Sequence, residues 1–141
     1  MRVVFDTVGF VRALINPRSR WGRIVFDHAD SYTLVISKPI AVEILAVLRR
    51  PEIVTLFRTL PGRDPATILG ILQTAETIDL SVVPAVNRDP KDNKFLATAV
   101  AGKADYLVSE DRDLLDMEQH EGIPIIRSAE FIGMVEEEQA A

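Results

Sequence analysis

The chain has 141 residues, of which 48% are hydrophobic and 26% charged, and this ordinary balance predicts a single globular domain over residues 1–141. A net charge of −5 does not favour a protein that coats nucleic acid by bulk electrostatics, and the absence of cysteine excludes disulfides, thiolate zinc sites and cysteine nucleophiles. Neither a signal peptide nor an apolar stretch long enough to cross a bilayer is evident, so we expect a cytoplasmic protein with no membrane partner.

The N-terminal half alternates short β-branched runs with amphipathic segments. Arg2 to Phe5 predicts a buried parallel strand, and Asp6 and Thr7 follow at its carboxyl end. The later predicted elements are, in order, a helix over 8–15, a basic loop with one tryptophan over 18–23, a helix over 24–29, a strand over 32–37 and a helix over 38–50 that ends at Pro51.

The C-terminal half continues this alternation after a helical hairpin. Its predicted elements are helices over 53–60 and 65–77 joined by a Pro61-Gly62 turn, a strand over 78–83 closed by Pro84, a helix that begins near Asp92, a strand over 106–108, a strand over 123–126 and a helix over 129–138. Strands that alternate with helices are typical of right-handed βαβ units. We therefore predict an α/β fold with a parallel sheet and helices on both of its faces.

Acidic residues mark two of the predicted helix starts. Asp92 precedes one helix and shares a face with its buried stripe, while Asp111 and Asp113 follow the buried strand over 106–108. Ligands of parallel sheets bind where strands end and helices begin, so these acids should converge on one crevice. Carboxylates that meet there repel one another, which is costly unless a cation lies between them.

Two further acids belong with this set. Asp6 follows the first strand, and Glu43 interrupts an otherwise apolar helix. Taken singly, each has an ordinary interpretation, because Asp is a favoured helix N-cap and Glu is common on helix surfaces. Taken together, carboxylates with no His or Cys nearby are the hard oxygen ligands that suit Mg²⁺ or Mn²⁺.

Other kinds of site lack their required residues. The start Asp111-x-Asp113 resembles a calcium loop, but Leu115 stands where an oxygen ligand belongs. Asp6-Thr7-Val8 lacks the second acid of an aspartyl-phosphate enzyme. The sequence contains neither a nucleophile elbow nor a glycine-rich phosphate loop, so acyl transfer and nucleotide binding are not supported.

Four motifs stand out in the sequence. They are Asp6-Thr7 after the first strand, Glu43 in the helix before Leu48-Arg49-Arg50-Pro51, Asp89-Pro90-x-Asp92-Asn93-x-Phe95-Leu96-x-x-Ala99, and Ala104-Asp105-Tyr106-Leu107-Val108-Ser109-x-Asp111-x-Asp113-Leu114-Leu115. Together these motifs resemble the PIN-domain family, most closely the toxin components of toxin–antitoxin systems that are similar to the VapC toxins. The resemblance covers nearly the whole chain, and its most specific part is the central stretch.

This resemblance implies a three-layer αβα fold whose central sheet has about five parallel strands in the order 3-2-1-4-5. It also implies an Mg²⁺- or Mn²⁺-dependent ribonuclease. The implied catalytic and metal-binding residues are Asp6, Glu43, Asp92 and Asp111, with Asp113 as a fifth ligand. The hydroxyls of Thr7 and Ser109 are expected to orient these acids. One residue departs from the family pattern, because Val8 stands where relatives usually carry an Asn.

For an RNA substrate, cations near the crevice would bind the backbone. The candidate substrate-binding residues are Arg12, Arg18, Arg20, Trp21, Arg23, Lys91 and Lys94. Trp21 would either stack a base or pack at a helix start.

The resemblance also implies partners, namely an antitoxin protein whose peptide covers the acidic crevice and a second copy of the chain in a homodimer. An apolar set on the hairpin would either make such contacts or lie in the core: Val54, Leu56, Ile68, Leu69 and Leu72. Two alternative functions remain open at this point, a PIN fold that binds RNA or protein without cutting, and a phosphatase of the same fold class.

Overall fold

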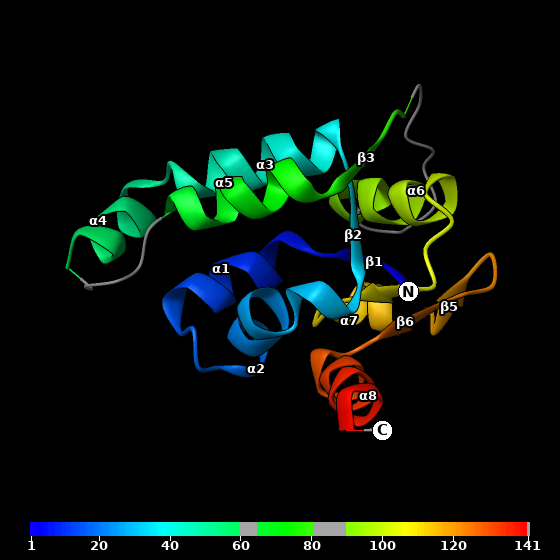
Figure 1. The fold of residues 1–141 in the computed structure, drawn as a ribbon. Helices are drawn as coiled ribbons and strands as arrows, with labels where there is room; N and C mark the ends of the chain where they lie inside the picture. Colours follow the sequence, from blue (N-terminus) through cyan, green and yellow to red (C-terminus); the bar gives the residue numbers. More distant parts are fainter. Residues whose placement is uncertain (60–64, 81–89, 141) are drawn as a thin grey trace.

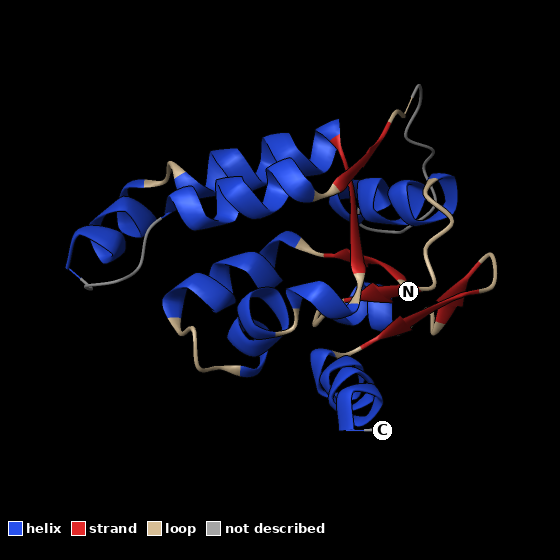
Figure 2. Ribbon diagram, viewed as in Figure 1, coloured by secondary structure: helices blue, strands red, loops and turns tan. Residues whose placement is uncertain are grey.

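The computed structural model describes residues 1–59, 65–80 and 90–140, which form a central sheet between two layers of helices (Figures 1 and 2). The strand order of the sheet is β3-β2-β1-β4-β6-β5. The strands are β1 (Arg2–Phe5), β2 (Thr33–Ser37), β3 (Glu76–Ile78), β4 (Tyr106–Val108), β5 (Gln119–His120) and β6 (Ile123–Ile126). All neighbours pair in parallel except β5 with β6, which are antiparallel.

The predicted α/β class and the order of the parallel strands are confirmed, with the two-residue strand β5 added at one edge. The central pair, β1 and β4, is in register, with Phe5 opposite Val108. Because both strands end at this level, Asp6 and Ser109 emerge side by side at the same edge of the sheet. The topology thus joins residues that are about a hundred positions apart in the sequence.

Helices cover both faces of the sheet. They are α1 (Thr7–Ile15), α2 (Arg20–Gly22), α3 (Lys38–Leu48), α4 (Pro51–Thr59), α5 (Pro65–Thr74), α6 (Asn93–Ala101), α7 (Arg112–Leu115) and α8 (Ser128–Ala140). Helix α6 packs on β1, β2 and β4, while α1, α2 and α8 lie on the opposite side of the sheet (Figure 1). Among the described residues, none of these helices has both the length and the apolar content that crossing a membrane requires.

An aromatic cluster joins β1 to the α1–α2–α8 layer. Phe5 is at its centre, with ring centroids 5.3–5.9 Å from those of its four neighbours, and it is 1% exposed. The neighbours are Phe10 on α1, Trp21 on α2, Tyr32 before β2, and Phe131 on α8. Edge-to-face aromatic pairs add about 0.5–1.5 kcal/mol each beyond their buried area, so this cluster fixes the position of α1 relative to the sheet.

Several predicted boundaries are wrong for identifiable reasons. Helix α3 ends at Leu48 rather than at residue 50, and Pro51 instead begins α4, where the first helical residue needs no partner for a backbone N–H. The second predicted helix starts earlier, at Arg20, and continues as a π-helical turn over Arg23–Asp27. The third strand is Glu76–Ile78 rather than 78–83. The predicted turn at Pro61-Gly62, the residues 81–84 and Asp89 lie outside the described residues.

Candidate active site

A cavity of about 350 Å³ opens where β1 and β4 end. Four of the acids predicted from the sequence line it, and they come from four separate segments of the chain: Asp6, Glu43, Asp92 and Asp111. Lys91 and Arg50 contribute cationic side chains, and an apolar wall is formed by Val8, Val11, Val47, Ile53 and Phe95. The structure therefore brings the predicted carboxylates to one place.

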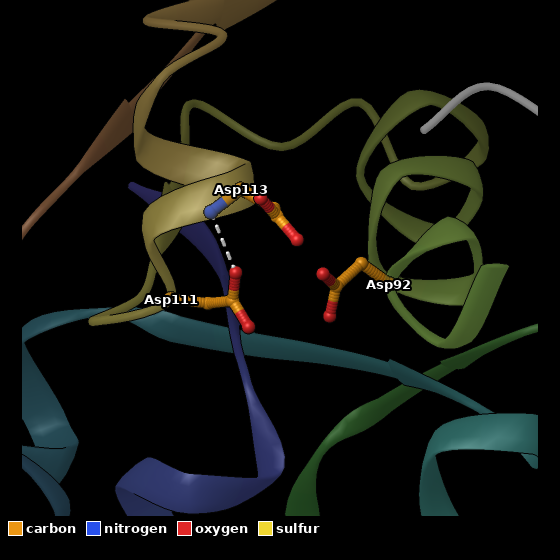
Figure 3. Close-up of side chains that lie close together, drawn as sticks. All are labelled: Asp92, Asp111 and Asp113. Carbon is orange, nitrogen blue, oxygen red and sulfur yellow. Dashed lines mark hydrogen bonds between the residues drawn. The ribbon is translucent and has the colours of Figure 1, made fainter. Parts of the chain in front are cut away.

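Three aspartates form the tightest acidic group among the described residues. Asp92, Asp111 and Asp113 each place one carboxylate oxygen within 4.8 Å of the others, and Figure 3 shows the three side chains pointing toward one another. Asp92 stands at the start of α6, and the other two stand at the start of α7. Asp111 caps α7, because its Oδ1 accepts from the Asp113 backbone N–H at 2.8 Å.

The donor set of this group fits a hard divalent cation. Like charges held this close destabilise one another in the absence of a counterion. Carboxylate oxygens without nitrogen or sulfur donors are the ligands that Mg²⁺, Mn²⁺ and Ca²⁺ prefer. Asp113 completes this group although it does not line the cavity that contains Asp92 and Asp111.

Asp6 is fixed by hydrogen bonds behind this group. Its Oδ1 accepts from the Gly9 N–H at 3.0 Å and caps α1, while its Oδ2 accepts from the Ser109 hydroxyl at 2.5 Å. The side chain is 5% exposed. Burial raises the pKa of the Asp6 carboxyl, although the hydrogen bonds from Ser109 and Gly9 oppose that rise. A carboxylate in this position stays charged most readily when a cation compensates for the lost hydration.

Glu43 is held at the other wall of the cavity. The Thr7 hydroxyl donates to Glu43 Oε2, and the Lys94 ammonium lies 3.1 Å from Glu43 Oε1. Lys94 is itself positioned, since its Nζ also donates to the Lys91 carbonyl at 2.6 Å. Glu43 is therefore paired with a cation of the chain.

Ser109 links the two acidic elements. Its hydroxyl donates to Asp6, and its Oγ accepts from the Asp111 N–H at 2.9 Å. The residue is fully buried at the end of β4. The contact to a site carboxylate that was predicted for Ser109 is present, and so is the contact of Thr7 with Glu43.

Replacing Ser109 by Ala should lower the affinity for Mn²⁺ by roughly 10–100-fold, because Asp6 and the Asp111 backbone lose their shared partner. Calorimetric titration with Mn²⁺ measures this change. The matched control is Ser37→Ala, which removes another fully buried hydroxyl at a strand end, bonded to Thr98 and not to an acid. Equal Mn²⁺ affinities for the two variants would show that Ser109 does not orient the site.

The predicted substrate-binding cations are divided among different surfaces. Lys91 and Lys94 are at the acidic cavity, as described above. Arg12 and Arg20 instead line a second cavity at the C-terminal end of α1. Arg23 pairs with Glu136 of α8 at 3.4 Å, and Arg18 is exposed but lines neither cavity.

Trp21 does not have the position needed to stack a base. Its side chain is 3% exposed and packs edge-to-face with Phe5. The packing interpretation of this residue is therefore correct, and the stacking interpretation is wrong. On the helical hairpin, Ile68 lies in the core, whereas Leu69 is 39% exposed and Val54, Leu56 and Leu72 are half-buried.

Two further residues line the acidic cavity. The sequence did not predict Arg50 there, and it left the effect of Val8 on the site open. Arg50 reaches the cavity from the turn between α3 and α4. Val8, where the family usually carries an Asn, is 48% exposed and lines the cavity. Its isopropyl group extends the apolar wall and offers no hydrogen bond.

Comparisons with known proteins show the family and the fold of the chain. The sequence matches the PIN-domain family over residues 2–113. An uncharacterised protein of Methanocaldococcus jannaschii is 32% identical over 125 residues, covering 83% of this chain and 75% of that protein. The fold is similar to a chain in the crystal structure of VapBC2 from Rickettsia felis bound to a DNA fragment from its promoter. In that comparison the TM-score is 0.59 and the identity 14%, with 90% of this chain and 98% of that chain covered.

Proposed function

Since the chain belongs to the PIN-domain family, we propose that it is a divalent-metal-dependent ribonuclease and the toxin of a toxin–antitoxin pair. The observation that carries this proposal is the convergence of Asp6, Glu43, Asp92 and Asp111 on one cavity. Structural acids rarely gather from four separate segments, because their mutual repulsion costs stability. Such a gathering is expected where the acids serve a metal ion and its chemistry.

The metal ligands in this proposal are Asp92, Asp111 and Asp113, assisted by Asp6. An Mg²⁺ or Mn²⁺ ion bound there would activate water for attack on a phosphodiester and offset the charge that develops on the phosphate. The chain's own contribution is to hold the acids in place. Asp6 is fixed by Ser109 and Gly9, and Glu43 by Thr7 and Lys94.

Cations at the same cavity support a polyanionic substrate. Arg50 and Lys91 line it beside the acids, and both side chains are exposed to solvent. A guanidinium and an ammonium in these positions would bind the phosphates that flank the reacting one. The apolar wall beside them would exclude bulk water and strengthen those contacts.

The proposed partners are RNA, a cognate antitoxin and a second copy of the chain, acting in the cytoplasm. The fold neighbour in Rickettsia felis is part of a VapBC2 assembly, which supports a protein partner for this chain as well. An antitoxin segment with a basic side chain would complement the acids of the cavity and block metal or substrate. The half-exposed apolar surface on α4 and α5 is a candidate for the contact between two copies.

We expect the purified protein to cut single-stranded RNA in the presence of Mn²⁺ or Mg²⁺ and to stop when the metal is chelated. The measurement is gel analysis of end-labelled RNA, with a DNA strand of the same sequence and a small phosphomonoester as parallel substrates. Phosphomonoester turnover without RNA cleavage would identify a phosphatase instead. Saturable RNA binding without any cleavage would identify a binding module and contradict the enzymatic proposal.

A further inference from the structure

A second cavity of about 420 Å³ is lined by residues from the C-terminal end of α1, whereas residues nearer the start of that helix line the acidic cavity. Its wall combines the end of α1, the start of α2 and the start of α8. The lining residues that matter here are Arg12, Asn16, Ser19, Arg20 and Trp21. None of the described residues that line this cavity carries a carboxylate.

The polar groups of this second cavity are suited to an anion. Among the described residues, Arg12 and Arg20 form no ion pair, whereas the nearby Arg23 is paired with Glu136. The Asn16 side-chain oxygen already accepts from the Arg18 N–H at 3.0 Å, so its amide group is left to donate. Ser19 Oγ likewise accepts from the Gly22 N–H at 3.1 Å, so its hydroxyl proton is also left to donate.

Trp21 supplies an independent indication of a ligand. Its indole Nε1–H is buried and has no hydrogen-bond partner among the described residues. The six-membered edge of the ring faces α1, because a Cβ at Gly9 would lie 2.5–2.7 Å from Cζ3, Cε3 and Cη2. The edge that carries Nε1 is the opposite one. A buried donor without an acceptor is destabilising, so an acceptor that reached Nε1 would recover that loss.

The position of the cavity relative to the acids suggests the source of the anion. Val8 and Val11 of α1 line the acidic cavity, and Arg12 and Asn16 of the same helix line the second one. A rise of 1.5 Å per residue gives about 12 Å along the axis from Val8 to Asn16. This span corresponds to a few nucleotides of a single strand that follows α1.

We propose that the second cavity binds a backbone phosphate of the RNA substrate, a few nucleotides away from the scissile phosphate. This inference rests on the proposed ribonuclease function and specifies how that substrate is bound. Arg12 and Arg20 neutralise the phosphate, and Asn16, Ser19 and the Trp21 N–H donate to its oxygens or to the adjoining base. A long RNA therefore bridges two cavities, and a dinucleotide reaches only the acidic one.

The test compares the double variant Arg12→Gln/Arg20→Gln with wild type on a 12-nucleotide RNA and on a dinucleotide. We expect KM for the 12-mer to rise about tenfold, and the slope of log KM against log salt to fall by about 0.7, the value for one lost phosphate contact to a single strand. We expect kcat for the 12-mer to change less than twofold, and cleavage of the dinucleotide to stay unchanged. The control variant Arg58→Gln/Lys103→Gln removes the same charge from exposed positions outside both cavities and should match wild type.

Occupancy of the cavity can be read directly, because Trp21 is the only tryptophan of the chain. Adding the 12-mer to the metal-free protein should change the Trp21 fluorescence in wild type and not in Arg12→Gln/Arg20→Gln. This readout requires no cleavage, so it separates failure of the cavity from failure of the enzyme. An unchanged KM, an equal loss on both substrates, or a fluorescence change produced by inorganic phosphate and not by RNA would each overturn the proposal.

Discussion

Replacing Asp92 by Asn should reduce metal-dependent RNA cleavage by roughly 10²–10³-fold while the fold persists. Asp92 is 4% exposed and belongs to the aspartate group that meets across the cavity. The amide keeps the shape of the side chain but removes the charge that a divalent ion requires. Asp6→Asn should act in the same direction, because Asp6 lines the same cavity. The measurements are cleavage of end-labelled RNA and calorimetric Mn²⁺ titration on the same protein samples.

The control for this prediction is Asp105→Asn. Asp105 is exposed and precedes β4, at the opposite end of the strand from the site, where its carboxylate accepts from the Arg2 backbone N–H at 2.7 Å. Asparagine can accept the same bond, so cleavage by this variant should equal that of wild type. If Asp92→Asn and Asp105→Asn cleave equally well, the acids do not form the active centre. Identical purification of both variants also excludes a contaminating nuclease.

The sequence predicted the strands most accurately where the strand is fully buried, because burial alone requires a run of apolar residues. The runs over 106–108 and 123–126 are flanked by polar residues and consist of large apolar side chains, and both strands occur at the predicted positions. The acids were predictable for a related reason, since parallel strands place their following residues at one edge of the sheet. Asp6 and Asp111 needed only the topology to be brought together.

The edge strand β3 was less predictable, because contacts with other strands determine its position and its own sequence has no apolar alternation. Strand β3 includes Glu76 and Thr77, which are exposed and have no apolar alternation. It pairs with β2 in parallel, and Arg2 fixes Glu76 through two hydrogen bonds, at 2.5 and 3.0 Å. A contact between the first strand and an edge strand cannot be inferred from local sequence. The predicted strand was therefore placed too far along the chain.

The directions of the arginine side chains within residues 12–23 could not be predicted from the sequence either. Four arginines within 12–23 were assigned to one surface, yet the structure sends two to the second cavity and one to Glu136. A regular helix would have fixed their directions by its 3.6-residue period. Here α2 has three residues and continues into a π-helical turn, so periodicity does not apply. Tertiary packing of Trp21 determines the directions instead.

The close packing of α2 also predicts a large effect on stability. Replacing Gly22 by Ala should lower the free energy of unfolding by about 3 kcal/mol. A Cβ at Gly22 would lie 2.2 Å from the Pro17 carbonyl oxygen and 2.4 Å from its carbonyl carbon. These are backbone atoms of the short loop between α1 and α2, so they cannot rotate away as a side chain could. The backbone of Gly22 itself is ordinary, with φ −60° and ψ −44°, so close approach alone requires glycine. Overpacking of this severity falls at the upper end of core substitutions.

Thermal unfolding measures the effect, and the midpoint for Gly22→Ala should fall by roughly 10 °C. The matched variant Gly133→Ala replaces an exposed glycine of α8 whose added Cβ meets nothing within 4 Å, so it should stabilise the helix by up to about 1 kcal/mol. Because Gly22 adjoins Trp21 at the second cavity, Gly22→Ala should also alter the Trp21 fluorescence while the acids of the first cavity keep their contacts. If Gly22→Ala and wild type are equally stable, α2 does not pack so closely on the loop that a Cβ at Gly22 would lie 2.2 Å from the Pro17 carbonyl oxygen. That result would also contradict the position of Arg12 and Arg20 at a common cavity, because this position depends on the packing of α2 against the loop.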